Sequence, residues 1–257
     1  MKLFAGIDVG SAATKAVLLD EQLQVLGRGL TASAGDFAAA ASLAFEQALA
    51  QAGRKRADVA VVVATGYGRE NVAFAAFQRT EIDCHARGAF HHFPRAIVVV
   101  DIGGQDNKII QLDDRGHRVS FTMNRKCAAG TGAFLEELAL RLKIPLSKLS
   151  ELASQSQDPS VKLGSYCTVF AMTEILSQLR AGVKPQDLVR AALESVARRV
   201  LETRVISGEV VATGGVVAHN PLLQEILARV LDTTVHLPPD PQHTGALGAA
   251  LAAAQAR

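Results

Sequence analysis

The chain alternates short apolar runs of strand length with longer stretches in which apolar residues recur at helical spacing. In the first part, apolar runs at 3–9 and 15–20 flank a small-residue turn and predict two strands, and a run at 25–30 predicts a third. The stretch 36–52 carries apolar residues at helical spacing and predicts a helix. The continuous apolar run 59–64 is typical of a strand buried on both faces.

The second part of the chain opens with a repeat of the first. Asp8-Val9-Gly10-x4-Lys15 and Asp101-Ile102-Gly103-x4-Lys108 match in residue class and in spacing, 93 residues apart. Each follows an apolar strand and precedes another apolar strand that ends in aspartate. A duplicated strand-turn-strand unit predicts two similar domains.

Helical periodicity dominates the chain after this second turn. Helices are predicted at 132–143, 145–154, 168–181 and 185–207. The end alternates again, with a strand, a helix, a strand and an alanine-rich helix predicted at 209–213, 221–231, 233–237 and 246–254. Asn220 is the predicted N-cap of the helix at 221–231, and the apolar residues of 121–123 are predicted to lie in the core. This order of strands and helices predicts an α/β fold.

Composition narrows the class of protein. At 257 residues, 49% apolar and 20% charged, the chain is long enough for one large domain or two smaller ones. The net charge of +2 is spread over interspersed signs, and 2 Tyr with no Trp offer little to stack on bases, which argues against nucleic acid as a partner. No segment has the length of a signal peptide or a membrane span, so we expect a cytoplasmic protein with no membrane partner.

The glycine turns carry the first candidate chemistry. A turn of type Asp-x-Gly-x4-Lys between two strands can present backbone N–H groups to phosphate oxygens, and its lysine adds a positive charge. One such turn is a common hairpin and means little. Two turns in equivalent places, with a third glycine turn at 213–215 between a strand and a helix, favour a nucleotide between two facing domains. Asp8 and Asp101 could hold hydrated Mg2+ or orient an attacking water.

The cysteines are the second group of residues with candidate chemistry. Cys127 lies in the glycine-punctuated stretch 124–132, directly before an amphipathic run, and Cys167 opens a second apolar-periodic segment. The N–H groups at a helix N-terminus favour a thiolate. Three cysteines do not make a disulfide framework, and a lone buried cysteine is more often an inert thiol. Cys84, which is followed by His85 without any ligand spacing, is predicted to be a structural thiol.

These motifs together resemble a known family. The three turns are similar to the phosphate-1 (8–15), phosphate-2 (101–108) and adenosine (213–220) motifs of the superfamily of actin, sugar kinases and heat-shock ATPases. A closer resemblance is to the ATP-dependent activators of 2-hydroxyacyl-CoA dehydratases and the related BadF/BadG/BcrA/BcrD subunits of benzoyl-CoA reductases. The segments that carry it span the chain: Gly6–Ser11, Ala64–Arg69, Glu81–Ala86, Asp101–Asp106, Lys126–Gly132, Cys167–Ala171 and Gly245–Ala250.

The resemblance implies a fold and a domain organisation. It implies two duplicated actin-like (ribonuclease H-like) α/β domains with the nucleotide cleft between them. The first would cover 1–92 and the second 93–242, which would carry the cluster-binding helices. The C-terminal helix 243–257 would pack back onto the first domain.

The resemblance also implies a set of functional residues. Asp8, Asp101 and Gln105 would be catalytic, with Gln105 positioning the hydrolytic water. The nucleotide would be bound by Gly10, Ser11, Ala12, Lys15, Gly103, Gly104, Lys108, Gly130, Thr131, Gly214, Gly215, Val216, Asn220 and Gln242. Asp8 and Asp101 would hold Mg2+ through water. Cys127 and Cys167 from each of two identical chains would ligate one 4Fe-4S cluster on the two-fold axis.

The implied function is ATP-dependent, low-potential electron transfer by a homodimer. Its cofactors would be ATP or ADP, Mg2+ and one 4Fe-4S cluster, its donor a ferredoxin or flavodoxin, and its acceptor a 2-hydroxyacyl-CoA dehydratase, a benzoyl-CoA reductase or a double-cubane-cluster protein. A small-molecule kinase of the same superfamily and a nucleotide-switched interaction module are the alternatives. Arg125, Ala133 and Met172 depart from the family pattern, which has an acidic residue, Arg and Glu there, and they bear on partner docking.

Overall fold

Two five-stranded sheets form the framework of the protein. The computed structural model describes residues 2–124, 128–164 and 167–256. The chain divides into two compact units, one formed by 1–99, 110–120 and 238–257 and the other by 100–109 and 121–237. No helix in these described ranges is long and apolar enough to span a bilayer.

The first sheet begins with the predicted strand-turn-strand unit. Its strands are β1 (Leu3–Val9), β2 (Ala13–Leu19), β3 (Val25–Ala32), β4 (Val59–Thr65) and β5 (Phe77–Gln78). Their order is β3-β2-β1-β4-β5, with β2 antiparallel to β1 and β3, and β4 parallel to β1 and β5. In this register Asp8 lies directly opposite Lys15. The hairpin therefore places both charged side chains of the first turn at the same end of the sheet.

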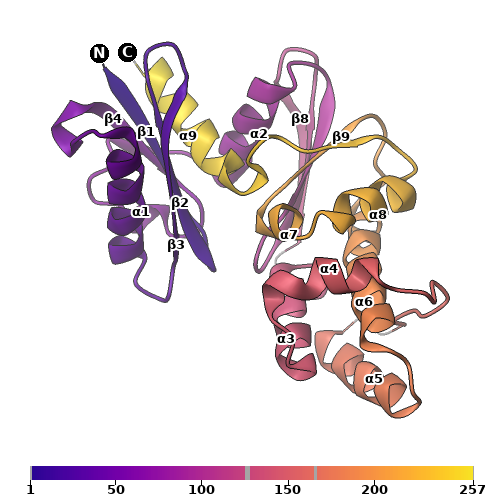
Figure 1. Ribbon diagram of the computed structural model, residues 1–257. Helices are drawn as coiled ribbons and strands as arrows, with labels where there is room; N and C mark the ends of the chain where they lie inside the picture. The colour runs from indigo at the N-terminus through magenta and orange to yellow at the C-terminus, as the bar shows by residue number, and fades with distance from the viewer. Residues whose placement is uncertain (1, 125–127, 165–166, 257) are drawn as a thin grey trace. The chain divides into compact units, whose positions relative to one another are not determined.

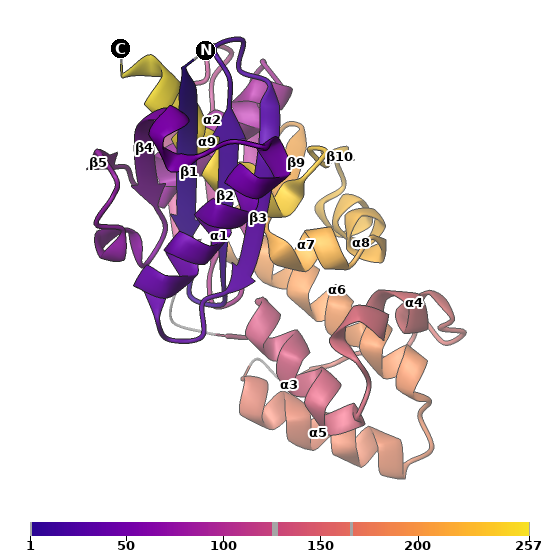
Figure 2. The ribbon, with the colours of Figure 1, turned by 60° about the vertical axis from the view of Figure 1, so that its left-hand side comes forward.

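Helices cover both faces of this sheet. Helix α1 (Phe37–Ala52) lies on one face, and α2 (Glu81–His92) and α9 (Thr244–Gln255) lie on the other (Figures 1 and 2). Helix α1 begins where the Asp36 carboxylate accepts a hydrogen bond from the Ala39 N–H, and it ends at Gly53 with φ +62°. The predicted helix at 36–52 is confirmed.

Backbone contact without intervening side chains holds α9 in place. A Cβ on Gly248 would stand 1.7 Å from the Cys84 carbonyl oxygen of α2, and one on Gly6 would stand 2.0 Å from the Ala246 carbonyl oxygen. Glycine is the residue that allows such an approach. The alanine-rich composition of α9 thus serves close packing against β1 and α2.

The second sheet contains the second copy of the strand-turn-strand unit. Its strands are β6 (Ile97–Ile102), β7 (Asn107–Leu112), β8 (Arg118–Asn124), β9 (Val210–Thr213) and β10 (Val235–His236), in the order β10-β9-β6-β7-β8. The prediction that 121–123 are core residues was wrong for Phe121, which is 50% exposed on the edge strand β8. Strand β8 lies at the edge of the sheet, and none of its residues is buried.

Helices make up most of the rest of the second unit (Figure 1). They are α3 (Gly132–Leu142), α4 (Leu149–Ser154), α5 (Thr168–Arg180), α6 (Pro185–Thr203), α7 (Gly215–His219) and α8 (Leu222–Leu231). The helix predicted at 145–154 begins as a 3-10 turn at Leu146–Lys148. Helix α6 ends four residues before the predicted position, because Arg204 adopts an extended backbone with ψ 146°.

The predicted N-cap role of Asn220 was wrong. A short helix, α7, precedes it, and the Asn220 amide donates a hydrogen bond back to the Val216 carbonyl oxygen at 2.8 Å. Helix α8 begins after Pro221, which has φ −54° and ψ −38°. The sequence pattern hid α7 because its five residues are too few to show a helical period.

Candidate functional site

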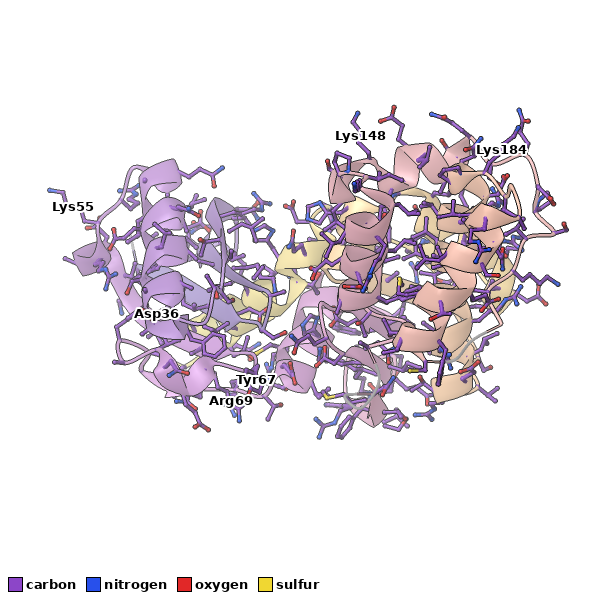
Figure 3. All side chains as sticks on the ribbon, turned by 90° about the horizontal axis from the view of Figure 1, so that it is seen from below. Asp36, Lys55, Tyr67, Arg69, Lys148 and Lys184 are labelled. Atoms are coloured by element: carbon purple, nitrogen blue, oxygen red, sulfur yellow. The ribbon has the colours of Figure 1, made fainter. Side chains whose placement is uncertain are left out.

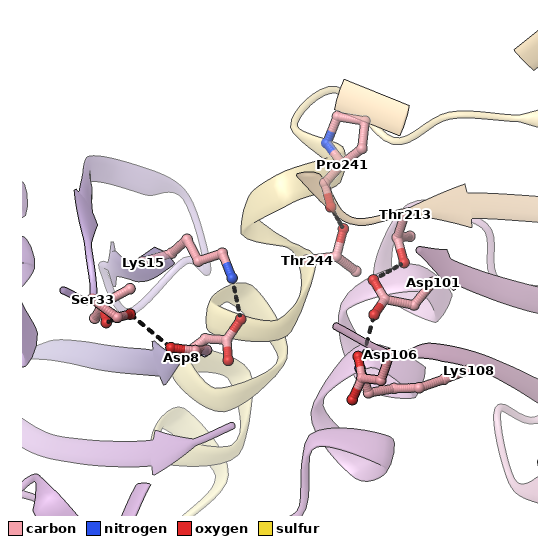
Figure 4. A network of polar contacts seen from close by, with 11 residues as sticks. Asp8, Lys15, Ser33, Asp101, Asp106, Lys108, Thr213, Pro241 and Thr244 are labelled. Carbon is pink, nitrogen blue, oxygen red and sulfur yellow. Dashed lines mark hydrogen bonds and ion pairs between the residues drawn. The ribbon is translucent and has the colours of Figure 1, made fainter. Parts of the chain in front are cut away.

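In the first glycine turn, the aspartate and the lysine form an ion pair. Asp8 is buried at the end of β1, and its Oδ2 lies 3.2 Å from Lys15 Nζ (Figure 4). The Gly10 N–H donates to the Ala13 carbonyl oxygen at 3.1 Å and closes the turn. The hydroxyl of Ser33, the residue directly after β3, donates to the Gly10 carbonyl oxygen at 2.6 Å. The turn is thus held from the neighbouring strand as well as by its own hydrogen bond.

Glycines from two other segments stand against the Asp8 carboxylate. A Cβ on Gly66, which has φ +89°, would lie 2.5 Å from Asp8 Oδ1. A Cβ on Gly245 would lie 3.0 Å from Asp8 Oδ2 and 2.9 Å from His85 Nε2. The motifs at 64–69 and 245–250 therefore meet at this carboxylate, and the motif at 81–86 lies beside Gly245 through His85.

The segment after β4 shows how one of these motifs is built. Arg69 Nη1 donates to the Gly66 carbonyl oxygen at 3.1 Å, and the Gly68 N–H donates to the Val9 carbonyl oxygen at 2.9 Å. Tyr67 is 71% exposed and meets the Phe37 ring edge-on, at 5.8 Å between centroids (Figure 3). These contacts hold the Gly66 turn against the end of β1.

The second glycine turn repeats the first with an additional acid. Asp101 Oδ2 lies 3.1 Å from Lys108 Nζ, which also contacts Asp106 Oδ1 at 2.7 Å (Figure 4). The Gly103 N–H donates to the Asp106 carbonyl oxygen at 2.9 Å, the counterpart of the bond that closes the first turn. The side chains of Asp101 and Lys108 are only 3% and 4% exposed. The duplication read from the sequence is therefore also a duplication of backbone hydrogen bonding.

The third glycine turn packs directly on the second. The Thr213 hydroxyl donates to Asp101 Oδ1 at 2.9 Å. A Cβ on Gly214, at φ +98°, would lie 2.3 Å from the Ile102 carbonyl oxygen and 2.9 Å from Asp101 Oδ1. Asn220 is buried, and within the described ranges its Oδ1 has no hydrogen-bond partner. The structure thus brings the predicted adenosine and phosphate-2 turns together within the second unit.

The turn at Ala128–Gly132 joins the same group. The N–H groups of Gly132 and Ala133, at the start of α3, donate to the carbonyl oxygens of Gly103 and Gly104 at 2.9 and 2.8 Å. The Thr131 hydroxyl, fully buried, donates to the Ala128 carbonyl oxygen at 2.7 Å. Two main-chain hydrogen bonds therefore tie the turn before α3 to the second glycine turn.

The cysteines have different surroundings. Cys167 is exposed and is the N-cap of α5, as the sequence predicts for a helix-start cysteine. Cys127 and Arg125 lie outside the described residues. Cys84 is buried in α2, and its burial raises the pKa of the thiol to about 12, although the Thr65 hydroxyl acts in the opposite direction. Cys84 therefore stays protonated, as expected of a structural thiol.

The other predicted site residues differ in their exposure to solvent. Ala12 and Gln105 are exposed, Ser11, Gly215 and Gln242 are half-buried, and Val216 is buried. Of the two described departures from the family pattern, Met172 is buried and Ala133 is half-buried. Among 2–124, 128–164 and 167–256, no three His, Cys, Asp or Glu side chains converge as metal ligands.

Sequence reasoning missed the polar side chains that support the second turn. Asp106 pairs with Lys108, and Asn107 is fully buried beside it. Thr213 was part of a predicted motif, but its bond to Asp101 spans 112 residues and has no local signal. The first turn has Ala13 at the position that Asp106 occupies in the second. This difference between the two repeats is the sequence feature that could have indicated the additional ion pair.

The arrangement suits the binding of phosphate. Each turn combines a buried carboxylate with a lysine ammonium, and groups of this kind, together with the backbone N–H groups of a glycine-containing turn, can bind phosphate oxygens and a hydrated divalent cation. The carboxylates are held rigidly, Asp8 between glycines and Asp101 by Thr213 and Lys108. Preorganised charges of this kind are the main requirement for phosphoryl transfer.

Known proteins resemble this chain over nearly its whole length. Residues 5–253 match the BadF/BadG/BcrA/BcrD ATPase family. The activator of lactoyl-CoA dehydratase from Anaerotignum propionicum is 43% identical over 254 residues, which cover 98% of this chain and 97% of that protein.

Two solved structures agree with this chain closely. Component A of (R)-2-hydroxyglutaryl-CoA dehydratase from Acidaminococcus fermentans matches with a TM-score of 0.93 at 39% identity, covering 99% of this chain and 98% of that one. The activator of 2-hydroxyisocaproyl-CoA dehydratase from Clostridium difficile, with bound ADPNP, matches with a TM-score of 0.91 at 37% identity, covering 98% and 94%. The predicted actin-like fold class is confirmed, and the chain belongs to the BadF/BadG/BcrA/BcrD ATPase family.

Proposed function

We propose that this chain uses ATP hydrolysis to drive low-potential electron transfer to a partner metalloenzyme that acts on an acyl-CoA. The observation that carries the nucleotide half of the proposal is the pair of Asp–Lys turns, each closed by the same glycine hydrogen bond. Both turns bind the phosphates of one ATP, and Gly214, Val216 and Asn220 bind its adenosine. The relative from Clostridium difficile with bound ADPNP supports this assignment.

The catalytic roles follow from the chemistry of the turns. Asp8 and Asp101 would hold Mg2+ through water, because Mg2+ keeps most of its waters and takes few carboxylates directly. The exposed Gln105 at the second turn orients the water that attacks the γ-phosphate. Lys15 and Lys108 stabilise negative charge on the phosphate oxygens.

A cysteine count supports a shared 4Fe-4S cluster. Such a cluster takes four thiolates, and the chain has 3 cysteines. The family resemblance implies Cys127 and Cys167 as the ligands from each chain, whereas Cys84 is buried and its thiol has a raised pKa. A second copy of the chain supplies the other two. When bound, the cluster would supply one-electron redox chemistry, and Cys167 stands at the N-cap of α5.

The surface beside Cys167 fits a homodimer. Val169 and Phe170, in the first turn of α5, are 70% and 68% exposed, and Leu176, two turns from Val169, is 44% exposed. Large apolar side chains exposed along one helix face favour an interface. A two-fold axis near Cys167 would cover this face with its copy and place both Cys167 thiols close together.

The partners follow from the reaction. A low-potential donor, a ferredoxin or flavodoxin, reduces the dimer, and an iron–sulfur enzyme accepts the electron. The relatives named as dehydratase activators support an acceptor that dehydrates a 2-hydroxyacyl-CoA. Membership of this family favours ATP-dependent electron transfer over the two alternatives, a small-molecule kinase and a nucleotide-switched interaction module.

Two measurements test the proposal. Asp101→Asn should abolish ATP hydrolysis, while Asp113→Asn, in the turn between β7 and β8, should leave it unchanged; equal rates would refute the role of the second turn. After anaerobic reconstitution, wild-type protein should bind about four iron atoms per dimer. Cys167→Ser should lose this iron and Cys84→Ala should retain it, whereas a folded, colourless wild-type dimer would refute the cluster.

A further inference from the structure

Asn107 is a buried amide without a partner. It begins β7 directly after the second glycine turn, and it is 1% exposed. In the described part of the chain, neither its Nδ2 nor its Oδ1 makes a hydrogen bond. Buried polar groups are nearly always satisfied, so a fully unsatisfied amide requires an explanation.

The position of Asn107 points to the Ala128–Gly132 turn. Side chains alternate along a strand, so Asn107 and Lys108 face opposite sides of the sheet. Lys108 contacts Asp101, whereas Asn107 Nδ2 lies 3.6 Å from the point where a Cβ on Gly130 would stand. Lys108 therefore faces the candidate phosphate site, and its neighbour Asn107 faces the turn before α3.

The Ala128–Gly132 turn is already tied to the second glycine turn at its other end. Gly132 and Ala133 donate main-chain hydrogen bonds to Gly103 and Gly104. A Cβ on Gly130, at φ +92°, would lie 2.6 Å from the Arg199 Cβ of α6. The turn is thus packed between the glycine turn and α6, with the unpaired amide directly beside Gly130.

We propose that Asn107 is a positioning residue that couples the Gly103–Lys108 turn to the Ala128–Gly132 turn. When a nucleotide occupies the glycine turn, the Asn107 amide hydrogen-bonds to main-chain groups of the Ala128–Gly132 turn and shifts the start of α3. This inference rests on the proposed nucleotide site, and it assigns the route by which that site acts on the segment next to Cys127.

Hydrogen exchange of the full-length protein, with and without Mg2+ and ADPNP, tests the coupling. In the wild type, ADPNP should slow exchange both in peptides covering 100–112 and in peptides covering 128–138. Asn107→Leu, which is similar in size and lacks the amide, should keep the first effect and lose the second. Ile109→Val, on the same face of β7, is the matched control and should keep both. Asn107→Ala replaces the leucine variant if circular dichroism shows that leucine does not fit.

The outcomes separate this inference from the proposed function. Slower exchange at 128–138 in Asn107→Leu, equal to that of the wild type, overturns the coupling role and leaves the amide as a group satisfied by a buried water. A wild type that responds at 100–112 and not at 128–138 overturns it as well. A wild type that responds at neither segment refutes nucleotide binding itself, and the coupling with it.

Discussion

Replacing Lys108 with methionine should destabilise the nucleotide-free protein more than the same change at Lys15. The Lys108 side chain is 4% exposed and forms ion pairs with Asp101 and Asp106, whereas the Lys15 side chain is 15% exposed and, among the described residues, pairs with Asp8. Removing one partner of a buried ion pair costs about 3–5 kcal/mol, because the remaining charge stays buried. For the more exposed Lys15 we expect about 1–3 kcal/mol, the cost of one unsatisfied buried group.

Urea denaturation of the two variants measures this difference. With a denaturant dependence of about 3 kcal/mol/M, the Lys108→Met midpoint should fall by about 1–1.7 M urea. Adding Asp101→Asn to Lys108→Met should restore at least about 1 kcal/mol relative to the sum of the single changes, since the charge left behind is removed. Equal midpoint shifts for Lys108→Met and Lys15→Met, or strict additivity in the double variant, would refute the buried-network explanation.

Three further expectations concern stability. Gly248→Ala should lower the melting temperature despite the better helix propensity of alanine, since its Cβ would stand 1.7 Å from the Cys84 carbonyl oxygen; an unchanged or raised melting temperature would contradict the contact. Burial raises the pKa of the Cys84 thiol to about 12 in the folded protein, against 9.0 in the unfolded chain. The contribution of this thiol to the free energy of unfolding is therefore complete below pH 9 and decreases above it, by up to about 1.4 kcal/mol per pH unit. The stability difference between wild type and Cys84→Ala should therefore shrink from pH 9 to 11, and a constant difference would count against a buried thiol. The pKa of Asp187 is lowered by the Ser156 hydroxyl and by the N–H groups of Asp158 and Gln157, so its contribution is present above pH 3.8 and is lost on acidification. Asp187→Asn should flatten the acid unfolding curve, and parallel curves for the two proteins would speak against this carboxylate.

Sequence patterns predicted correctly the helices and turns that are formed by interactions between neighbouring residues. The helix at 36–52 has its capping aspartate and its terminating glycine beside it in the sequence, and the repeated Asp-x-Gly-x4-Lys turns close with hydrogen bonds that span three residues. Gly182, expected just past the end of the helix at 168–181, has φ +89° there. Errors arose where the local signal was weak, as at the short α7, or where an apolar residue lies on an edge strand, as at Phe121.

The sequence by itself therefore determined the α/β class, the duplication and the candidate residues of each turn, because periodicity and turn chemistry act over a few neighbouring residues. Only the tertiary structure decided which turns meet. Thr213 bonds to Asp101 across 112 residues, Gly132 bonds to Gly103, and Gly248 lies against Cys84. It also decided that Asn107 is buried beside Gly130 without a partner in the described ranges. Such contacts depend on how distant segments pack, and no residue pattern within one segment encodes the position of another.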